Sequence, residues 1–380
     1  MLLVFLRLGC TSFGGPIAHL AYFQKELVER RRWCTETAYA EIVGLAQSLP
    51  GPASSQVGFA LGLLRSGWRG GLAAWVGFTL PSALLMFAFA LGDAHLKDAA
   101  ATRVLHGMQL VAVAVVAQAV LTMRRSLAPD LNRMFIAAAA AATVLFVPVA
   151  ATNLLAIGLG VASGLLLCRN REHPPAVHEP LLLKRSTAAY AGLVFLSLLL
   201  LSRTAASLSL QIFAAFYRTG ALVFGGGHVV LPLLEHAVVH RGWVTQPAFL
   251  SGYGVTQAMP GPLFSFAAYL GAIISPAHHA PLHALLALLG LFLPGLLLMA
   301  AVLPFWSSLR SNPTLRSALR GVNASVVGIL AATLIHPLIP SIIHTWSDAA
   351  AALTLFGLLN VPHVQPWMLV VAAGALSFFL

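Results

Sequence analysis

The sequence predicts an all-α polytopic integral membrane protein with two homologous, inverted repeats of about six transmembrane segments, interrupted helices and one linking segment. Two observations support this fold class. Of the 380 residues, 59% are hydrophobic and only 9% are charged, with a mean hydropathy of +0.86, whereas about a quarter of the residues of soluble domains are charged. In addition, the two ends of the chain share a series of motifs in the same order.

The charged residues exclude a soluble protein, because 22 Lys and Arg with 11 Asp and Glu residues cannot cover a globule of 380 residues. The formal net charge of +11 indicates basic cytoplasmic loops. We therefore expect contacts with the lipid bilayer and no nucleic-acid partner. Cys10, Cys34 and Cys168 are too scattered to predict disulfides or a metal site, and the apolar N-terminus lacks the basic start of a cleaved signal.

Stretches of about 20 apolar residues, which can cross a bilayer, define about thirteen predicted elements. The first repeat, residues 1–168, contains segments near 2–23, 39–64, 70–92, 104–122, 134–150 and 152–168. Residues 169–206 combine a polar connector with an isolated apolar segment near 187–202. The second repeat, residues 207–380, contains segments near 207–232, 247–275, 281–304, 318–338, 340–358 and 365–380.

An internal duplication relates the two sets of segments. FLRLGCTSFGG at 5–15 aligns with FYRTGALVFGG at 216–226, and GLAQSLPGP at 44–52 aligns with GVTQAMPGP at 254–262. The matched positions stay 210 to 214 residues apart through to the last segments. An odd linking segment between two sets of six would invert the second repeat, as in many secondary transporters whose substrate site lies at the midplane.

The distribution of basic residues is compatible with two topologies. With an intracellular N-terminus and thirteen spans, the inner loops hold thirteen Lys and Arg residues and the outer loops seven. If both Pro-Gly-Pro segments are re-entrant hairpins, an extracellular N-terminus gives fourteen against six. Both distributions satisfy the positive-inside rule, so charge does not choose between them.

Each repeat has a Gln-x-x-Pro-Gly-Pro motif inside an apolar segment. Proline lacks an N–H and clashes with the preceding turn, so the helix must break there. The freed backbone groups must be buried in protein or line a watery cavity. A purely structural kink remains an alternative. The motif residues are Gln47, Pro50, Gly51 and Pro52 in the first repeat and Gln257, Pro260, Gly261 and Pro262 in the second.

A second break follows Phe13 and Phe224. In the first repeat Gly14, Gly15 and Pro16 suit the start of a new helix, whose free N–H groups and dipole attract anions. The second repeat offers Gly225, Gly226, Gly227 and His228 at the corresponding place. Close helix packing is the alternative explanation for these glycines.

Arg7 and Arg218 occupy equivalent positions ahead of the two glycine breaks. A charge within an apolar segment costs about 2.5 kcal/mol or more, so a matched pair suggests a function in binding an anion. Snorkelling to the interface is the alternative. His19 lies near the first break, where it could supply a proton or a hydrogen bond or be a structural histidine.

Other features exclude several mechanisms. Carboxylates are almost absent from segment centres, with Glu41 and Glu235 the nearest, and cation transporters normally depend on such groups. The sequence lacks the GxxxxGK[ST] motif for ATP and has no metal-binding spacing or Ser-His-Asp set. We therefore expect a non-enzymatic anion transporter without a metal or another cofactor.

FGGPIAH, AQSLPGP, FGGGHVVLPLLE and GYGVTQAMPGPLFSFAAYLGA resemble segments of the chromate transporter family in its long-chain, two-repeat form. The resemblance covers essentially the whole chain. It implies a multi-pass protein of the bacterial inner membrane that exports chromate and confers chromate resistance. It also implies that the following residues are important for function: Phe13, Gly14, Gly15, Pro16, His19, Gln47, Pro50, Gly51, Pro52, residues 224–228, Gln257, Pro260, Gly261 and Pro262.

The resulting hypothesis is an alternating-access oxyanion exporter driven by the membrane potential or the proton-motive force. Glycine N–H groups at both breaks would hold the dianion, Arg7 and Arg218 would neutralise it, and the Pro-Gly-Pro segments would form walls or hinges. Transport of sulfate or another anion is the main alternative, and a membrane-embedded enzyme or assembly subunit is a remote one. The sequence leaves open whether two copies form a homodimer.

Overall fold

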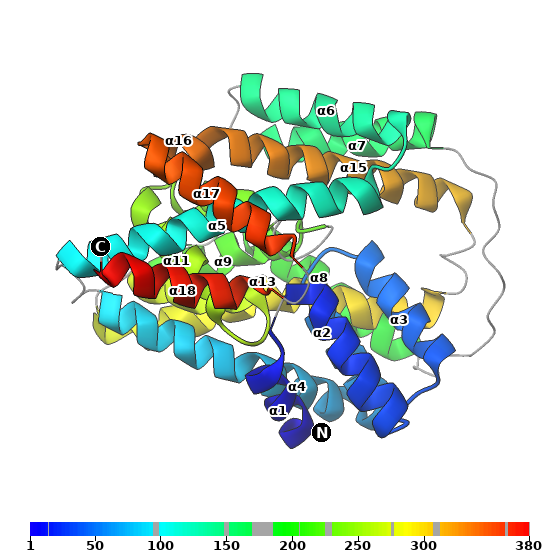
Figure 1. Cartoon of the computed structure of the whole chain (residues 1–380). Coiled ribbons are helices and arrows are strands. Elements are labelled where there is room, and N and C mark those ends of the chain that lie inside the picture. Colours follow the sequence, from blue (N-terminus) through cyan, green and yellow to red (C-terminus); the bar gives the residue numbers. More distant parts are fainter. Residues whose placement is uncertain are drawn as a thin grey trace.

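The computed structural model describes residues 1–13, 15–93, 99–147, 152–168, 185–204, 206–224, 230–274, 277–306, 312–361 and 364–379. These residues are mainly helical and contain no strand (Figure 1). The all-α prediction is therefore confirmed. Within the described part of the chain, four helical segments are long and apolar enough to cross a membrane. They are Ala53–Gly92, His106–Leu127, Ala280–Phe305 and Pro313–Ile342.

The two repeats contain corresponding elements on either side of α8 (Arg185–Leu201). The first repeat comprises α1 (Leu2–Thr11), α2 (Gly15–Phe23) with a π-helical extension (Gln24–Arg30), α3 (Glu36–Ser48), α4 (Ala53–Asp93), α5 (Ala99–Leu127), α6 (Leu131–Phe146) and α7 (Thr152–Leu167). The second comprises α9 (Leu208–Gly220), α10 (Val230–Val238), α11 (Gln246–Ala258), α12 (Phe266–Ile273), α13 (Ala280–Val302), α15 (Pro313–Thr333), α16 (Ile339–Ile342), α17 (Trp346–Leu359) and α18 (Pro366–Phe379). Short 3-10 turns (Leu263–Ser265, Ala277–His279, Leu303–Phe305) and a π-helical turn (Leu334–Leu338) join neighbouring elements of this repeat.

Local sequence signals start the same helix in both repeats. Thr35 caps α3 by accepting a hydrogen bond from the Ala38 N–H at 3.2 Å. Thr245 caps α11 in the same way, with the Ala248 N–H at 3.4 Å. A threonine oxygen at this position satisfies one of the N–H groups that a helix start leaves unpaired.

The apolar segments near 2–23, 39–64, 207–232 and 247–275 are not single helices. Each is divided at its glycine or Pro-Gly-Pro motif, as the predicted interruptions require. Helix α4 is also two arms, 53–65 and 68–93, because Ser66 and Gly67 leave helical geometry. Four of the twelve spans expected in the two repeats, namely the first two of each repeat, are therefore pairs of short helices.

The first Pro-Gly-Pro segment turns a re-entrant hairpin. The Arg65 guanidinium lies 4.8 Å from the centre of the Trp33 ring. Trp33 comes just before α3 and Arg65 ends the first arm of α4, so α3 enters and this arm leaves at the same end of the molecule. An arm of 13 residues is about 20 Å long, which is less than the thickness of a bilayer core. Of the two arrangements that the sequence left open, the hairpin is the one observed.

The repeats exchange helices with each other. Helices α6 and α7 of the first repeat pack on α15 of the second, and α17 and α18 of the second pack on α5 of the first (Figure 1). Gly321 of α15 meets Gly160 and Gly164 of α7, which brings the two helix backbones into contact. Small residues at such crossings allow the close approach that stabilises helix pairs in membranes.

The exchanged contacts also establish the direction of the repeats. His106 and Gln118 of α5 contact Asp348 and Leu359 of α17, at 2.9 Å and 2.6 Å respectively, so α17 runs parallel to α5. After a short turn at 343–345, α17 runs back in the direction opposite to α15 and α16 (Figure 1). Helix α15 therefore runs antiparallel to α5, although the two helices hold the same place in their repeats, and the repeats are inverted as predicted.

Candidate functional site: a polar cavity between the repeats

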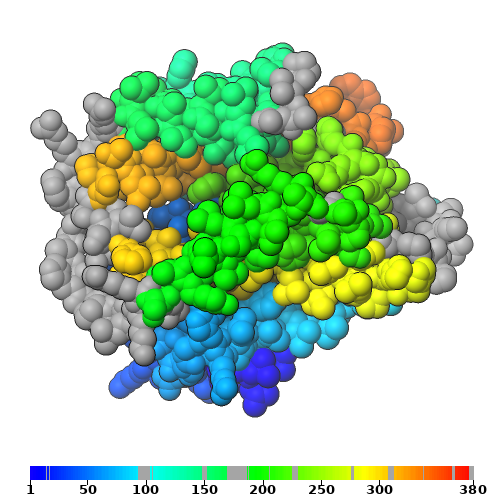
Figure 2. Space-filling model, turned by 180° about the vertical axis from the view of Figure 1, so that it is seen from behind, coloured from blue at the N-terminus to red at the C-terminus, as the bar shows by residue number. Residues whose placement is uncertain are grey.

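A cavity of about 670 Å³ lies where the interruptions of the two repeats meet. Its wall contains both Pro-Gly-Pro glycines, Gly51 and Gly261, and the glutamine of each motif, Gln47 and Gln257. The start of α2, the C-terminal half of α5, Asn323 of α15 and the segment before α18 complete it. In the view from behind, the surface is hollowed between the orange α15 and the yellow residues near 300, and blue atoms of the first repeat lie at the bottom (Figure 2).

The two motif glutamines present amide groups to this cavity. Gln47 is exposed at the end of α3, whereas Gln257 is buried at the end of α11. Gln257 Nε2 and Asn323 Oδ1 are buried atoms without a hydrogen-bond partner among the described residues. A buried amide of this kind is costly unless a ligand or water completes its hydrogen bonds.

Helix α5 adds a polar stripe to the opposite wall. Gln118, Thr122 and Ser126 follow one another at helical spacing of four residues, and all three line the cavity together with Gln365. No charged side chain belongs to the lining formed by the described residues. The wall therefore offers neutral hydrogen-bonding groups, which can bind an anion through N–H and O–H donors.

The first turn of α2 contributes backbone donors. Gly15 and Pro16 line the cavity at the N-terminus of this helix. The first N–H groups of a helix have no partner within it, and the helix dipole is positive at this end. The predicted anion-attracting helix start thus faces the same space as the two glutamines.

Each Pro-Gly-Pro glycine is hydrogen-bonded to the other repeat. The Gly51 N–H donates to the Val223 carbonyl at 2.7 Å, and the Gly261 N–H donates to the Ser12 carbonyl at 2.8 Å. The acceptors occupy the same position, immediately before Phe224 and Phe13. We call these two reciprocal bonds the cross-repeat hydrogen bonds. They tie each hairpin to the broken helix of the opposite repeat.

A buried glutamine side chain stabilises the contact between the repeats at Gly51. Gln56 is fully buried, and its Nε2 donates to the carbonyls of Pro50 at 2.9 Å and Gly295 at 3.0 Å. Pro50 belongs to the first repeat and Gly295 to α13 of the second. One amide therefore satisfies the carbonyl freed by the Pro-Gly-Pro break and a carbonyl of the opposite repeat.

Several predicted residues lie beside the cavity without lining it. The Phe13 ring packs on Trp367 at 5.3 Å, Phe224 packs on the hydrophobic core, and His19 is 1% exposed. The prolines of both motifs, Pro50, Pro52, Pro260 and Pro262, are likewise absent from the lining. Gly14, Gly225, Gly226, Gly227 and His228 lie outside the described residues.

The two arginines are not where the sequence hypothesis placed them. Arg7 is exposed on α1, and Arg218 donates from Nη1 to the Ser202 carbonyl at 2.6 Å, beyond the end of α8. Neither lines the cavity. The long side chain of Arg218 carries its charge to the polar groups at a helix end, which is the snorkelling alternative. We therefore remove both arginines from the proposed binding site.

Five polar lining residues outside the two Gln-x-x-Pro-Gly-Pro segments were missed by the sequence reasoning, namely Gln118, Thr122, Ser126, Asn323 and Gln365. The four-residue spacing of the three α5 residues within an apolar helix could have revealed them. Asn323 and Gln365 carry no local signal. They reach the cavity only because the repeats exchange helices, which is a tertiary property.

The two candidate carboxylates have structural partners. Glu41 accepts a hydrogen bond from Trp306 Nε1 at 2.8 Å, and Glu235 accepts one from Gln246 Nε2, also at 2.8 Å. Neither lines the cavity. The site thus contains no carboxylate among the described residues, which suits an anionic substrate better than a cation.

Comparison with known proteins places the chain in a family. The sequence model described as "Chromate transporter" matches residues 1–165 and 210–378. A chromate transport protein of Pseudomonas aeruginosa is 30% identical over 87% of this chain and 79% of its own length. One from Cupriavidus metallidurans is 27% identical over 99% of this chain and 92% of its own.

An uncharacterised transporter of Methanocaldococcus jannaschii is also similar, with 24% identity over 99% of this chain and 92% of its own length. No solved structure matches the chain significantly. The family is one of membrane transporters, and its model covers both repeats. The chain therefore belongs to the chromate transporter family.

Proposed function

We propose that this protein is a secondary transporter that exports chromate, or a closely similar tetrahedral oxyanion, across the bacterial inner membrane. The observation that carries this proposal is the uncharged cavity between inverted repeats, lined by amides, hydroxyls and a helix N-terminus. Export would lower the chromate concentration in the cytoplasm and so confer resistance. Chromate is also the substrate named for two of the relatives.

The chemistry of the wall suits a tetrahedral dianion. Four oxygens pointing in different directions require donors from several sides, and the Gln47 and Gln257 amides and the α2 helix start lie on different elements. Neutral donors bind a dianion through charge-assisted hydrogen bonds, which are stronger than neutral ones. The absence of a fixed cation from the described lining also allows release, because conduction requires binding that is not too strong.

One end of the molecule is rich in arginine. The end of α5, the start of α6 and the start of α15 lie close together there, since Arg124 contacts Met134 and Arg320 contacts the Cys168 carbonyl, and the turn within α4 lies toward the same side (Figure 1). The arginines of these segments are Arg65, Arg69, Arg124, Arg125, Arg133, Arg316 and Arg320. By the positive-inside rule this end faces the cytoplasm.

The cavity extends toward the same end. Its lining follows α5 as far as Ser126 and Leu127, in the turn that carries Arg124 and Arg125. Basic residues beside an entrance raise the local concentration of an anion. We therefore propose that the structure represents the state that loads substrate from the cytoplasm, which is the direction export requires.

The membrane potential would favour this direction. Moving a dianion out of a negative interior releases about 2.3 kcal/mol for each of its two charges per 100 mV. Alternating access would follow from exchanging the roles of the two inverted repeats around the site. The cross-repeat hydrogen bonds at Gly51 and Gly261 are the contacts that would have to rearrange.

Transport of radiolabelled chromate into inside-out membrane vesicles tests the proposal. A potential that is positive inside these vesicles should drive uptake, and control vesicles without the protein should show none. Gln47→Leu and Gln257→Leu should each raise the KM about ten- to a hundredfold, because losing a charge-assisted hydrogen bond costs about 1.5 to 3 kcal/mol. Arg7→Lys is the matched control and should leave the KM unchanged.

Sulfate is the second candidate, because it is also a tetrahedral dianion and the neutral donors of this wall do not distinguish it from chromate by charge. Competition by sulfate and by other anions in the same vesicles measures the selectivity. Sulfate competing at concentrations equal to chromate would broaden the substrate to oxyanions in general. Potential-driven uptake of neither ion would refute the proposed function.

A further inference from the structure

His19 occupies a buried position behind the cavity wall. It lies in α2 and is 1% exposed, and it does not line the cavity. Its Nδ1 is 3.4 Å from Ser54 Oγ, its ring meets Phe78 edge to face at 5.3 Å, and it lies close to the Ser12 main chain. Its Nε2 has no hydrogen-bond partner among the described residues. A direct contact between His19 and the anion is therefore not available in this state.

His19 is part of a polar cluster in the first repeat. The other first-repeat residues with a buried, unpartnered polar atom among the described residues are Ser12, Ser55, Gln56, Trp75 and Thr79. Unsatisfied atoms of this kind are rare in native structures and require an explanation. At three of these places the second repeat has apolar side chains instead, since Val230, Phe266 and Phe292 stand where His19, Gln56 and Thr79 are. Folding of this junction therefore does not demand polar residues.

The cluster touches one of the cross-repeat hydrogen bonds. The Ser12 carbonyl, which accepts the Gly261 N–H at 2.8 Å, belongs to the residue whose main chain lies beside the His19 ring. If the second hairpin moves away, this carbonyl loses its donor. A protonated imidazole has N–H groups on both nitrogens and could replace it.

We infer that His19 is a proton-binding site that couples proton entry to anion export. The inference rests on the proposed function. The proton binds at Nε2 and stabilises the state in which Gly261 has left Ser12, while the neutral ring is compatible with the bond observed here. A ligand that prefers one of two conformations shifts the equilibrium toward it.

The proton balance of the cycle is simple. One proton enters from the outer side onto His19 Nε2 after the anion has left, and it is released to the cytoplasm when the Gly261 to Ser12 bond re-forms. No covalent bond to the substrate is made or broken. Inward proton movement and outward dianion movement carry charge in the same direction, so the potential favours both.

The surroundings of His19 contain no second titrating partner among the identified contacts. Ser12 comes from the end of α1, and Ser54 and Phe78 come from the two arms of α4. On α3 the titratable group packed against α2 is Tyr39, whose hydroxyl donates to the Leu20 carbonyl at 2.7 Å. Among these groups, the imidazole of His19 is the one whose unperturbed pKa lies closest to neutral pH.

Proteoliposomes containing the full chain and a pH-sensitive dye test this inference. Proton movement opposite to radiolabelled chromate should accompany net transport by the wild-type protein. In His19→Gln, which cannot titrate, net transport driven by a pH gradient should fall about tenfold, while chromate–chromate exchange should stay within about threefold of wild type. His278→Gln, which alters an exposed histidine on the 3-10 turn before α13, is the matched control.

Ser54→Ala provides a second, milder variant. It removes the Nδ1 partner of His19, so the pH midpoint of net transport should move by roughly half a unit or more. A purely structural residue would change the amount of folded protein without moving this midpoint. Chromate transport without proton movement, or a midpoint unchanged in Ser54→Ala, would overturn the inference and leave the proposed function standing. A complete absence of chromate transport would overturn both.

Discussion

The junction around Gly51 and the junction around Gly261 have the same backbone arrangement. In both, the N–H of a glycine with positive φ donates to a main-chain carbonyl of the other repeat. That carbonyl belongs to the residue immediately before the phenylalanine at which the helix of the other repeat is interrupted. The packing beneath them is also shared. Gly9 of α1 meets the Phe78 carbonyl of α4, and Gly220 of α9 meets the equivalent carbonyl of Leu291 in α13. The duplication has therefore kept contacts between helices at atomic detail, while most side chains have diverged.

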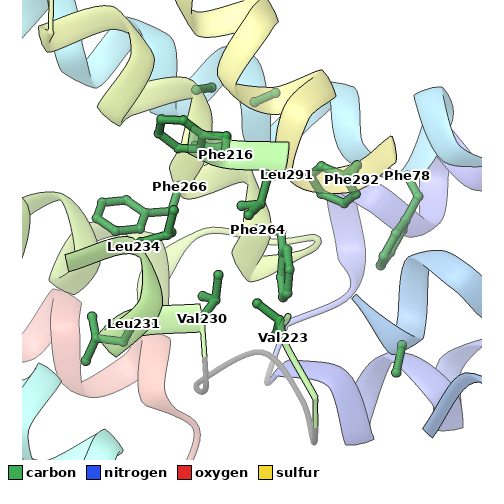
Figure 3. Packing of buried hydrophobic residues seen from close by; sticks show 14 of the residues in the cluster. Phe78, Phe216, Val223, Val230, Leu231, Leu234, Phe264, Phe266, Leu291 and Phe292 are labelled. Carbon is green, nitrogen blue, oxygen red and sulfur yellow. The ribbon is translucent and has the colours of Figure 1, made fainter. Parts of the chain in front are cut away.

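The two junctions differ in the chemistry of their side chains. His19 faces Ser54 in the first repeat, whereas Val230 and Phe264 hold the same positions in the second. Figure 3 shows the apolar version, in which Val223, Val230 and Phe264 pack together with Phe292. The two repeats therefore share a backbone framework at these junctions but differ in the polarity of the side chains that surround it.

The largest loss of stability is expected at the contacts between the helices that the repeats exchange. A Cβ on Gly321 would come within 2.6 Å of the Gly164 Cα, and it would also collide with the Gly160 carbonyl. A Cβ on Gly374 would lie 3.3 Å from the flexible end of Met108. Gly321→Ala should therefore destabilise the protein by about 3 kcal/mol or more, and Gly374→Ala by less than about 1 kcal/mol.

Thermal unfolding in detergent and the amount of protein in the membrane measure this difference. Gly158→Ala is the control, because its Cβ would meet open space on an exposed face of α7. Equal stability of the Gly321 and Gly374 variants would show that the α7–α15 contact is no tighter than the α5–α18 contact.

The next largest loss of stability is expected at the two Pro-Gly-Pro turns, where alanine variants of the two glycines can be compared. Gly51 has φ +122° and Gly261 has φ +91°, which only glycine adopts without strain. A Cβ on Gly51 would lie 2.8 Å from the backbone of Gly295, whereas one on Gly261 would lie 3.0 Å from the movable Ser82 hydroxyl. Alanine should cost about 1 to 3 kcal/mol at each site, with the larger loss at Gly51.

Chromate uptake in vesicles should fall with this loss of stability, and it should fall more than the amount of protein does if the turns also move during transport. A Gly261→Ala protein less stable than Gly51→Ala would contradict the packing argument. Full transport by both variants would remove the two turns from the mechanism.

A smaller loss of stability is expected when a polar side chain of the first repeat is compared with its apolar equivalent in the second. Gln56→Leu leaves the Pro50 and Gly295 carbonyls without their common donor, so it should destabilise the protein by about 2 kcal/mol. Phe266→Leu at the equivalent position keeps an apolar side chain and should cost less than about 1.5 kcal/mol. Unfolding of both variants in the same detergent measures the two losses of stability. A smaller loss for Gln56→Leu would show that this amide does not hold the repeats together.

The sequence was sufficient to predict the repeats, their inversion and the breaks in the helices. These features depend on local rules, because Pro50, Gly51 and Pro52 interrupt a helix in any context and the matched motifs reveal duplication. The cavity wall could be predicted only in part. Gln47 and Gln257 were identified from their motif, whereas the contributions of Asn323 and Gln365 depend on the exchange of helices between repeats.

The arginine pair shows why equivalent positions can mislead. Matching Arg7 with Arg218 suggested one shared function, but a long side chain can place its charge far from its own backbone. The direction in which it extends depends on the neighbouring element. Arg218 has α8 beside it and reaches the Ser202 carbonyl, whereas Arg7 is exposed on α1.

The smallest expected effect compares these two arginines directly. Arg218→Gln shortens the side chain and loses the 2.6 Å bond to the Ser202 carbonyl, so it should destabilise the protein by about 1 kcal/mol. Arg7→Gln changes an exposed side chain and should alter stability by less than about 0.5 kcal/mol. Because neither arginine lines the cavity, both variants should retain the wild-type KM for chromate. Unfolding curves and vesicle uptake measure the two quantities separately, and a KM raised in both variants would return the arginines to the substrate path.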